Sequence, residues 1–148
     1  MKISSIRELE KIAGKIKNIL SLGDVVFLHG EIGVGKTTFA RFLINSFENE
    51  KKLKKSEVLS PTFNIVFEYK IEEFTIKHFD LYRLKNYDDI KNIGLLEDLE
   101  QSITLIEWPE LIRNKPQNRL DLFFKYKEDY NERSLTIEAN GRLQKYEF

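Results

Sequence analysis

The chain of 148 residues has no cysteine, only two histidines and one tryptophan, and no excess of charge of either sign. Without cysteine there are no disulfide bridges, thiol nucleophiles or cysteine-based zinc sites, which fits a reducing compartment. His29 and His78 are too few to build a histidine-rich metal site alone. Because 24 Lys plus Arg balance 24 Asp plus Glu, no overall positive field would hold a polyanion, so we do not expect autonomous nucleic-acid binding.

Long hydrophobic runs are also missing. The longest apolar runs are a few residues, far short of the roughly 20 needed to cross a bilayer. The N-terminus leads into a charged amphipathic segment rather than the apolar region of a secretion signal. We therefore expect a cytoplasmic protein without a membrane-spanning part. The length and the lack of any linker-like tract predict one domain over residues 1–148.

One local charge run departs from the balance. Residues 51–55, Lys-Lys-Leu-Lys-Lys, are flanked by Glu48, Glu50 and Glu57, which cancel much of their field. The run is interpreted as a solvated linker, with a phosphate-contacting patch as the alternative.

Hydrophobic periodicity predicts the first elements. Residues 5–8 have the spacing of a capping box, and apolar residues then recur at helical intervals as far as Leu20. After a turn at 21–24, residues 25–28 form a short apolar run typical of a strand buried on both faces. A helix is predicted over 37–47, after a glycine-rich loop.

The remaining pattern mixes strands and short helices. Residues 64–70 and 74–79 predict an antiparallel pair, and 87–99 predict one or two short helices broken near Gly94. Further strands are predicted at 103–106, 120–126 and 134–139, the last two joined through 128–131. The fold class predicted is an α/β P-loop NTPase domain, with a mixed sheet of parallel centre and antiparallel hairpins flanked by helices.

The glycine-rich loop carries the strongest motif, because residues 30–37 match the Walker A pattern in full. Gly33 and Gly35 let the backbone turn so that successive N–H groups face phosphate oxygens, and the following helix adds the positive end of its dipole. Lys36 can neutralise the β and γ phosphates, and the Thr37 hydroxyl can ligate Mg²⁺. The sequence therefore predicts an ATP and Mg²⁺ site, against the alternative of an ordinary glycine turn. The loop residues expected to contact the nucleotide are Gly30, Glu31, Ile32, Gly33, Val34, Gly35, Lys36 and Thr37.

Hydrolysis also needs a carboxylate at the end of a neighbouring strand. Asp80 and Glu107 each follow a predicted strand, and strand carboxyl ends converge on the ligand crevice in such sheets. Either could hold the metal's water shell or orient the attacking water. Each could instead be a plain surface acid.

Four motifs occur in order between residues 25 and 110. They are Gly-Glu-Ile-Gly-Val-Gly-Lys-Thr-Thr-Phe at 30–39, Ser-Pro-Thr-Phe at 60–63, His-Phe-Asp-Leu-Tyr-Arg-Leu at 78–84 and Leu-Ile-Glu-Trp-Pro-Glu at 105–110. Together they resemble the TsaE (YjeE) family of bacterial P-loop ATPases. The resemblance implies a small α/β ATPase that supports threonylcarbamoyladenosine formation in tRNA by associating with the TsaB and TsaD subunits.

The resemblance also implies roles for single residues. It gives Lys36, Asp80 and Glu107 as catalytic, and Thr37, Asp80 and Glu107 as metal-binding. Thr38 falls on a phosphate position, Thr62 on a threonine able to sense the γ-phosphate, and Trp108 on the second place of a Glu-Trp pair. For Thr62 a turn residue after Pro61 is the alternative, and for Trp108 it is core packing.

The roles of two further residues, His78 and Arg83, stay open. His78 lies two residues before Asp80, so both side chains share one face of an extended strand, and a catalytic role is one interpretation of His78. Arg83 could contact phosphate or form a salt bridge at a helix start.

Three other functions compete with an accessory ATPase. A small-molecule kinase would use the same loop but needs an arginine-rich lid, for which residues 84–119 offer only Arg113 and Arg119. A GTPase is suggested faintly by Asn-Arg-Leu-Asp at 118–121, which precedes an apolar run instead of following one. In the third, a nucleotide-dependent binding module, hydrolysis is incidental and the bound state recruits partners.

Overall fold

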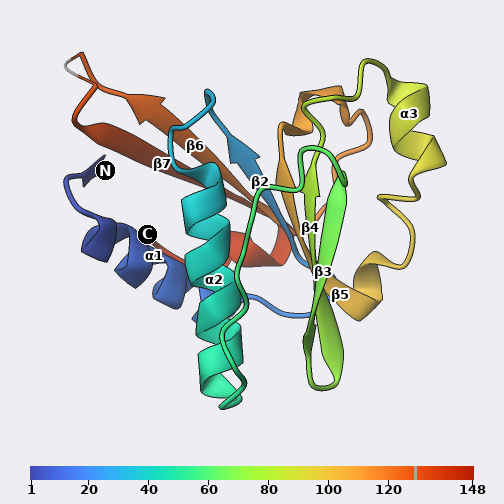
Figure 1. Ribbon diagram of the computed structural model, residues 1–148, viewed down its shortest axis with the longest axis horizontal. Helices are drawn as coiled ribbons and strands as arrows, with labels where there is room; N and C mark the ends of the chain where they lie inside the picture. The colour runs from blue at the N-terminus through green and yellow to red at the C-terminus, as the bar shows by residue number, and fades with distance from the viewer. Residues whose placement is uncertain (129) are drawn as a thin grey trace.

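A computed structural model describes residues 1–128 and 130–148 of the chain (Figure 1). In these residues a seven-stranded sheet has the order β1-β7-β6-β2-β5-β4-β3. Its strands are β1 (Lys2–Ile3), β2 (Val25–His29), β3 (Val66–Ile71), β4 (Phe74–Asp80), β5 (Ser102–Glu107), β6 (Arg119–Tyr126) and β7 (Arg133–Asn140).

The centre of the sheet is parallel and its margins are antiparallel, as predicted. Strand β2 pairs in parallel with both β5 and β6, and β5 pairs in parallel with β4. The hairpins β3–β4 and β6–β7 are antiparallel, and β1 pairs antiparallel with β7. The predicted α/β fold with a mixed sheet is therefore confirmed.

Helices cover both faces of this sheet (Figure 1). On one face, α1 (Ile6–Ile19) and α2 (Lys36–Glu50) pack together over Val26 and Leu28 of β2. On the other, Ile90 of α3 (Tyr87–Asn92) joins the cluster that contains Val25 and Phe27. Successive residues of β2 thus point to opposite cores, which confirms a strand buried on both faces.

Local signals account for the helix ends. The Ser5 hydroxyl accepts the Glu8 N–H at 3.2 Å, and the Glu8 carboxylate accepts the Ser4 N–H at 2.7 Å. This arrangement is a capping box whose return bond falls one residue earlier than usual. Helix α3 ends before Gly94, whose φ of 66° is accessible to glycine at little cost.

Some elements differ from the sequence prediction. Strand β1 and the 3₁₀ helix Gly141–Lys145 were not predicted, because two or five residues carry too short a pattern. Strand β3 begins at Val66 rather than at residue 64, since Ile65 has a φ of 69° and leaves the extended conformation. Asp129, in the predicted connection 128–131, lies outside the described residues. The described helices include none long and apolar enough to span a bilayer.

Candidate functional site

The loop between β2 and α2 has the backbone that its glycines predict. Gly33 and Gly35 have φ values of 77° and 123°, and α2 begins at Lys36. Gly30, at φ 145°, lies so close to β6 that a Cβ atom would be 2.7 Å from the carbonyl oxygen of Phe124. Glycine at position 30 is therefore required by packing as well as by backbone conformation, which the motif alone did not indicate.

Lys36 points back across the mouth of the loop. Its ammonium donates a hydrogen bond to the Gly30 carbonyl and lies 3.5 Å from the centre of the Trp108 ring. Burial lowers the pKa of the Lys36 ammonium below its ordinary value, while the negative charges of Glu107, Glu110 and Asp80 act in the opposite direction. The cation is thus fixed where an anion entering the loop would meet it.

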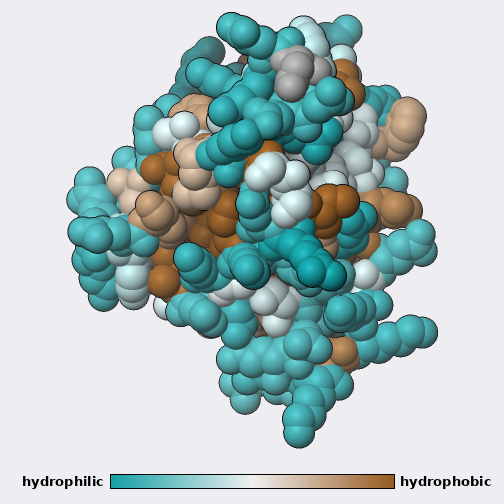
Figure 2. All heavy atoms as spheres, turned by 90° about the vertical axis from the view of Figure 1, so that its left-hand side faces the viewer, coloured by the Kyte–Doolittle hydropathy of each residue, from teal (hydrophilic) through white to brown (hydrophobic). Residues whose placement is uncertain are grey.

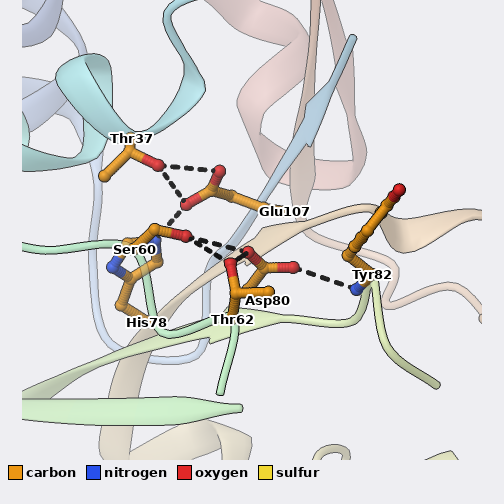
Figure 3. A network of polar contacts seen from close by, with 7 residues as sticks. All are labelled: Thr37, Ser60, Thr62, His78, Asp80, Tyr82 and Glu107. Atoms are coloured by element: carbon orange, nitrogen blue, oxygen red, sulfur yellow. Dashed lines mark hydrogen bonds and ion pairs between the residues drawn. The ribbon is translucent and has the colours of Figure 1, made fainter. Parts of the chain in front are cut away.

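Glu107 ends β5 beside the first turn of α2 (Figure 3). The Thr37 hydroxyl lies 3.0 Å from both carboxylate oxygens of Glu107. On its other side, Glu107 Oε2 is 2.6 Å from Nε2 of His78, which is fully buried on β4. The buried carboxylate is therefore oriented from two elements, and its partner His78 is not a surface residue.

Asp80 ends β4 directly opposite Glu107 in the sheet register. Its Oδ2 accepts the hydroxyls of Thr62 at 2.7 Å and Ser60 at 3.0 Å, and its Oδ1 accepts the Tyr82 N–H at 2.9 Å (Figure 3). Both strand-end acids are 2% exposed, so neither is a plain surface acid. Asp80 fixes the 60–62 segment, whereas Glu107 contacts the start of α2.

A cavity of about 410 Å³ lies between these groups. Of the residues predicted from the sequence, it is lined by Ile32, Gly33, Gly35, Lys36, Thr37, Thr38, Thr62, Asp80, Glu107 and Trp108. The other predicted residues lie elsewhere. Val34 is buried in the core below the loop, and Gly30 and Glu31 line a neighbouring cavity.

Three lining residues escaped the sequence analysis: Ser60, Tyr82 and Arg133. Ser60 and Tyr82 stand inside motifs that were recognised, so their place in the motif was the available signal. Arg133 begins β7, about 100 residues after the loop, and nothing in its local sequence marks it.

Trp108 and Arg83 had two predicted alternatives each. Trp108 lines the cavity and also packs partly against the hydrophobic cluster around Phe27. For Arg83, which was expected to contact phosphate or form a salt bridge, the structure shows a contact with the 60–63 segment. Its guanidinium donates to the Phe63 carbonyl at 3.3 Å and lies over the Phe63 ring, which ties it to the 60–63 segment.

The residues that suggested rival functions are engaged elsewhere. Arg119 donates to Asp121 at 2.9 Å, and Arg113 lies over the Tyr87 ring. The Asn118 side chain accepts the Arg142 N–H at 3.0 Å. Neither arginine lines the cavity that contains Lys36.

The model of the family "Threonylcarbamoyl adenosine biosynthesis protein TsaE" matches residues 3–135. The chain belongs to the TsaE family. Apart from Arg133, the residues that line the cavity belong to the four motifs that resemble this family.

Comparisons with individual proteins support this family assignment. The proteins named "tRNA threonylcarbamoyladenosine biosynthesis protein TsaE" in Rickettsia conorii and Aquifex aeolicus are 40% and 35% identical over 112 and 114 residues, or 76% and 77% of this chain. These matches cover 62% and 77% of the two relatives. The crystal structure of Bacillus subtilis YdiB matches with a TM-score of 0.76 at 30% identity, covering 98% of this chain and 88% of that one. At 62%, the match covers less than two thirds of the length of the Rickettsia conorii relative.

Proposed function

We propose that the chain binds ATP with Mg²⁺, hydrolyses it slowly, and supports threonylcarbamoyladenosine modification of tRNA together with the TsaB and TsaD subunits. The names of its relatives support the pathway. The observation that carries the ATPase part is that Lys36, Thr37 and Glu107 meet at one cavity behind a glycine loop.

The residues at the cavity have different roles in the proposed hydrolysis. The loop N–H groups and Lys36 would hold the β and γ phosphates. Glu107, held by His78, would orient the attacking water at the γ-phosphate. Thr62 and Ser60, which share the Asp80 carboxylate, lie at the same cavity and would respond to the γ-phosphate.

The donor set around Thr37 fits Mg²⁺. Magnesium in nucleotide sites is held by one or two protein oxygens, by substrate phosphates and by retained waters, rather than by a full protein cage. The Thr37 hydroxyl and the Glu107 and Asp80 carboxylates offer such oxygens, and the described residues contain no group of three or more His, Cys, Asp or Glu side chains that could hold a metal ion. Bound there, the ion would neutralise phosphate charge during hydrolysis.

A nucleotide can shift a conformational equilibrium only by its differential affinity for the two states. The 60–63 segment is suited to carry this difference, because Ser60 and Thr62 reach the cavity through Asp80 while Phe63 is 82% exposed. A partner that contacts this segment would therefore distinguish the triphosphate from the diphosphate form.

The test is steady-state phosphate release during a titration with purified TsaB–TsaD complex. We expect slow release by the chain alone and a several-fold or larger increase with the complex. Lys36→Ala serves as the blank, because it removes the charge aimed at the phosphates. A fast intrinsic rate that the complex leaves unchanged would contradict the accessory role and favour the kinase alternative.

A further inference from the structure

The lysine run of the sequence forms a loop at the far end of α2. Residues 51–55, which we call the lysine loop, follow the last residue of α2 and expose all four lysines, whereas Leu53 packs against the core. Figure 1 shows α2 ending at the lower edge of the molecule, and Figure 2 shows that this edge is covered mostly by hydrophilic residues. Because α2 has 15 residues and begins at Lys36, the lysine loop lies about 20 Å from the cavity that contains Lys36.

The acids that flank the lysine loop in the sequence are largely engaged by other groups. Glu48 is only 4% exposed, and its carboxylate accepts hydrogen bonds from the Asn45 side chain at 2.9 Å and from the Ser56 N–H at 3.0 Å. Glu50 forms an ion pair with Lys17 of α1 at 2.5 Å. Within the described part of the chain, no hydrogen bond or ion pair engages the four lysine side chains of the loop. The cancellation of charge expected from the sequence is therefore only partial.

The lysine loop is anchored separately from the segment at the cavity. Ser56 is tied to Glu48 through its N–H and its hydroxyl, and Val58 is buried in the core at 4% exposure. Residues 60–63, whose hydroxyls contact Asp80, begin only beyond these two anchors. A displacement of residues 60–63 therefore does not require the lysine loop to move. A partner bound at the lysine loop would be held equally with ATP, with ADP or without nucleotide.

The surroundings of the lysine loop favour an acidic protein surface over a nucleic acid. Three exposed acids limit the basic surface: Glu57 lies just beyond the loop, and Glu72 and Glu73 form the β3–β4 turn at the same edge of the molecule (Figure 1). An RNA backbone carries a phosphate at every nucleotide, so it would meet these acids as well as the lysines, and the balanced net charge of the chain adds no attraction. A small acidic patch on a protein can face the lysines alone.

We propose that the lysine loop is a docking surface for an acidic face of the partner complex, which it attracts whatever nucleotide is bound. Exposed ion pairs contribute little to affinity, but complementary charge raises the rate at which two proteins meet. The lysine loop would therefore set how fast the complex forms, while residues 60–63 respond to the nucleotide. This inference rests on the proposed association with the TsaB–TsaD complex.

The test measures association and dissociation rates with purified TsaB–TsaD complex by surface plasmon resonance, across a salt series and with or without a non-hydrolysable ATP analogue. The loop variant, Lys54→Glu with Lys55→Glu, reverses two exposed charges of the lysine loop. The matched control is Lys11→Glu with Lys15→Glu, at exposed positions of α1. Each Lys→Glu change lowers the net charge by two, so both double variants carry the same net charge.

We expect the loop variant to associate about tenfold more slowly than the wild type at low salt and to dissociate at a nearly unchanged rate. Added salt should slow the wild type and narrow the difference, because screening shortens the reach of the charges. The control variant should associate as the wild type does. The ratio of affinities with and without the ATP analogue should be the same in all three proteins. Their intrinsic phosphate release should also be equal, which verifies folding, since none of the changed lysines lines the cavity that contains Lys36.

Equal association rates for the loop variant and the wild type would overturn this inference while leaving the proposed function intact. Equal slowing in both variants would also overturn it, because net charge would then be the cause. If the loop variant loses affinity for unmodified tRNA in fluorescence anisotropy but associates normally with the complex, the lysine loop serves RNA instead. If the wild type does not bind the complex at all, the proposed association fails, and this inference fails with it.

Discussion

Glu107 is held in the site from two sides. It is 2% exposed, lies 3.0 Å from the Thr37 hydroxyl, and is 2.6 Å from His78 Nε2. If the Glu107 carboxylate is to accept a proton from the attacking water, the imidazole would donate to it from Nε2. His78 therefore fixes one carboxylate oxygen and acts as a positioning residue for Glu107.

This arrangement predicts the behaviour of His78→Phe, which keeps a buried ring but removes the donor. We expect kcat to fall by about tenfold or more with little change in KM for ATP, because only the orientation of the carboxylate is lost. His78→Asn, which keeps an N–H donor, should recover part of kcat. In a double-mutant cycle with Glu107→Gln, the losses should be far from additive. Additive losses would mean that His78 acts independently of Glu107.

The two strand-end acids should respond differently to loss of charge. Glu107→Gln should lower kcat by about 100-fold with nucleotide still bound, if Glu107 orients the attacking water. Asp80→Asn should mainly raise the Mg²⁺ concentration needed for half-maximal turnover, because it removes charge near the metal's water shell. Phosphate release measured across a Mg²⁺ titration separates the two effects. Identical profiles for both variants and the wild type would show that these strands do not serve the reaction.

At the scale of elements, β6 is joined to its neighbours by a buried polar network. Asp121 of β6 accepts hydrogen bonds from His29 of β2 at 2.8 Å, from Arg119 at 2.9 Å, and from Asn140 of β7 at 3.1 Å. Burial acts to raise the pKa of Asp121, but the hydrogen bond from His29 and the charge and hydrogen bond of Arg119 outweigh it and hold the pKa below its ordinary value. The network connects the strand that precedes the phosphate loop to the hairpin that carries Arg133.

Asp121→Asn should therefore lower the free energy of unfolding at neutral pH by about 1–3 kcal/mol. Because the pKa of Asp121 is lower in the folded than in the unfolded chain, its stabilisation is present above the unfolded-state pKa of about 3.9. It is lost as pH falls through the folded-state pKa. Urea unfolding between pH 7 and 3 should show a shallower acid decline in the variant. If the free energies of unfolding of the variant and the wild type fall in parallel with pH, Asp121 does not contribute to the loss of stability in acid.

At the scale of the whole molecule, the cavity that contains Lys36 joins the start of α2, the ends of β4 and β5, the 60–62 segment and the hairpin residue Arg133. A ligand bound there would tie these elements to the folded state. Mg-ATP at 100 times its Kd should add about 2.7 kcal/mol to the free energy of unfolding. Calorimetric Tm should rise with Mg-ATP in the wild type and stay constant in Lys36→Ala. An equal rise in both proteins would place the nucleotide elsewhere.

Much of the architecture could be predicted because its signals are local. The periodicity of α1, the apolar run of β2 and the glycines of the loop depend on neighbouring residues, and the strand alternation that follows predicts hairpins. The boundaries were less accurate, as at β3, because a single residue in a left-handed conformation, Ile65, keeps the strand from beginning before Val66.

The sequence by itself determined which residues could bind phosphate and metal, because the Walker A pattern requires glycine, lysine and threonine at fixed spacing along one turn of chain. It also named the strand-end acids. Only the tertiary structure decided that His78 holds Glu107, that Ser60 and Thr62 share Asp80, and that Arg133 reaches the cavity. These contacts join residues from 18 to almost 100 positions apart. They depend on strand order and register, which long-range packing of the sheet sets and no local pattern encodes.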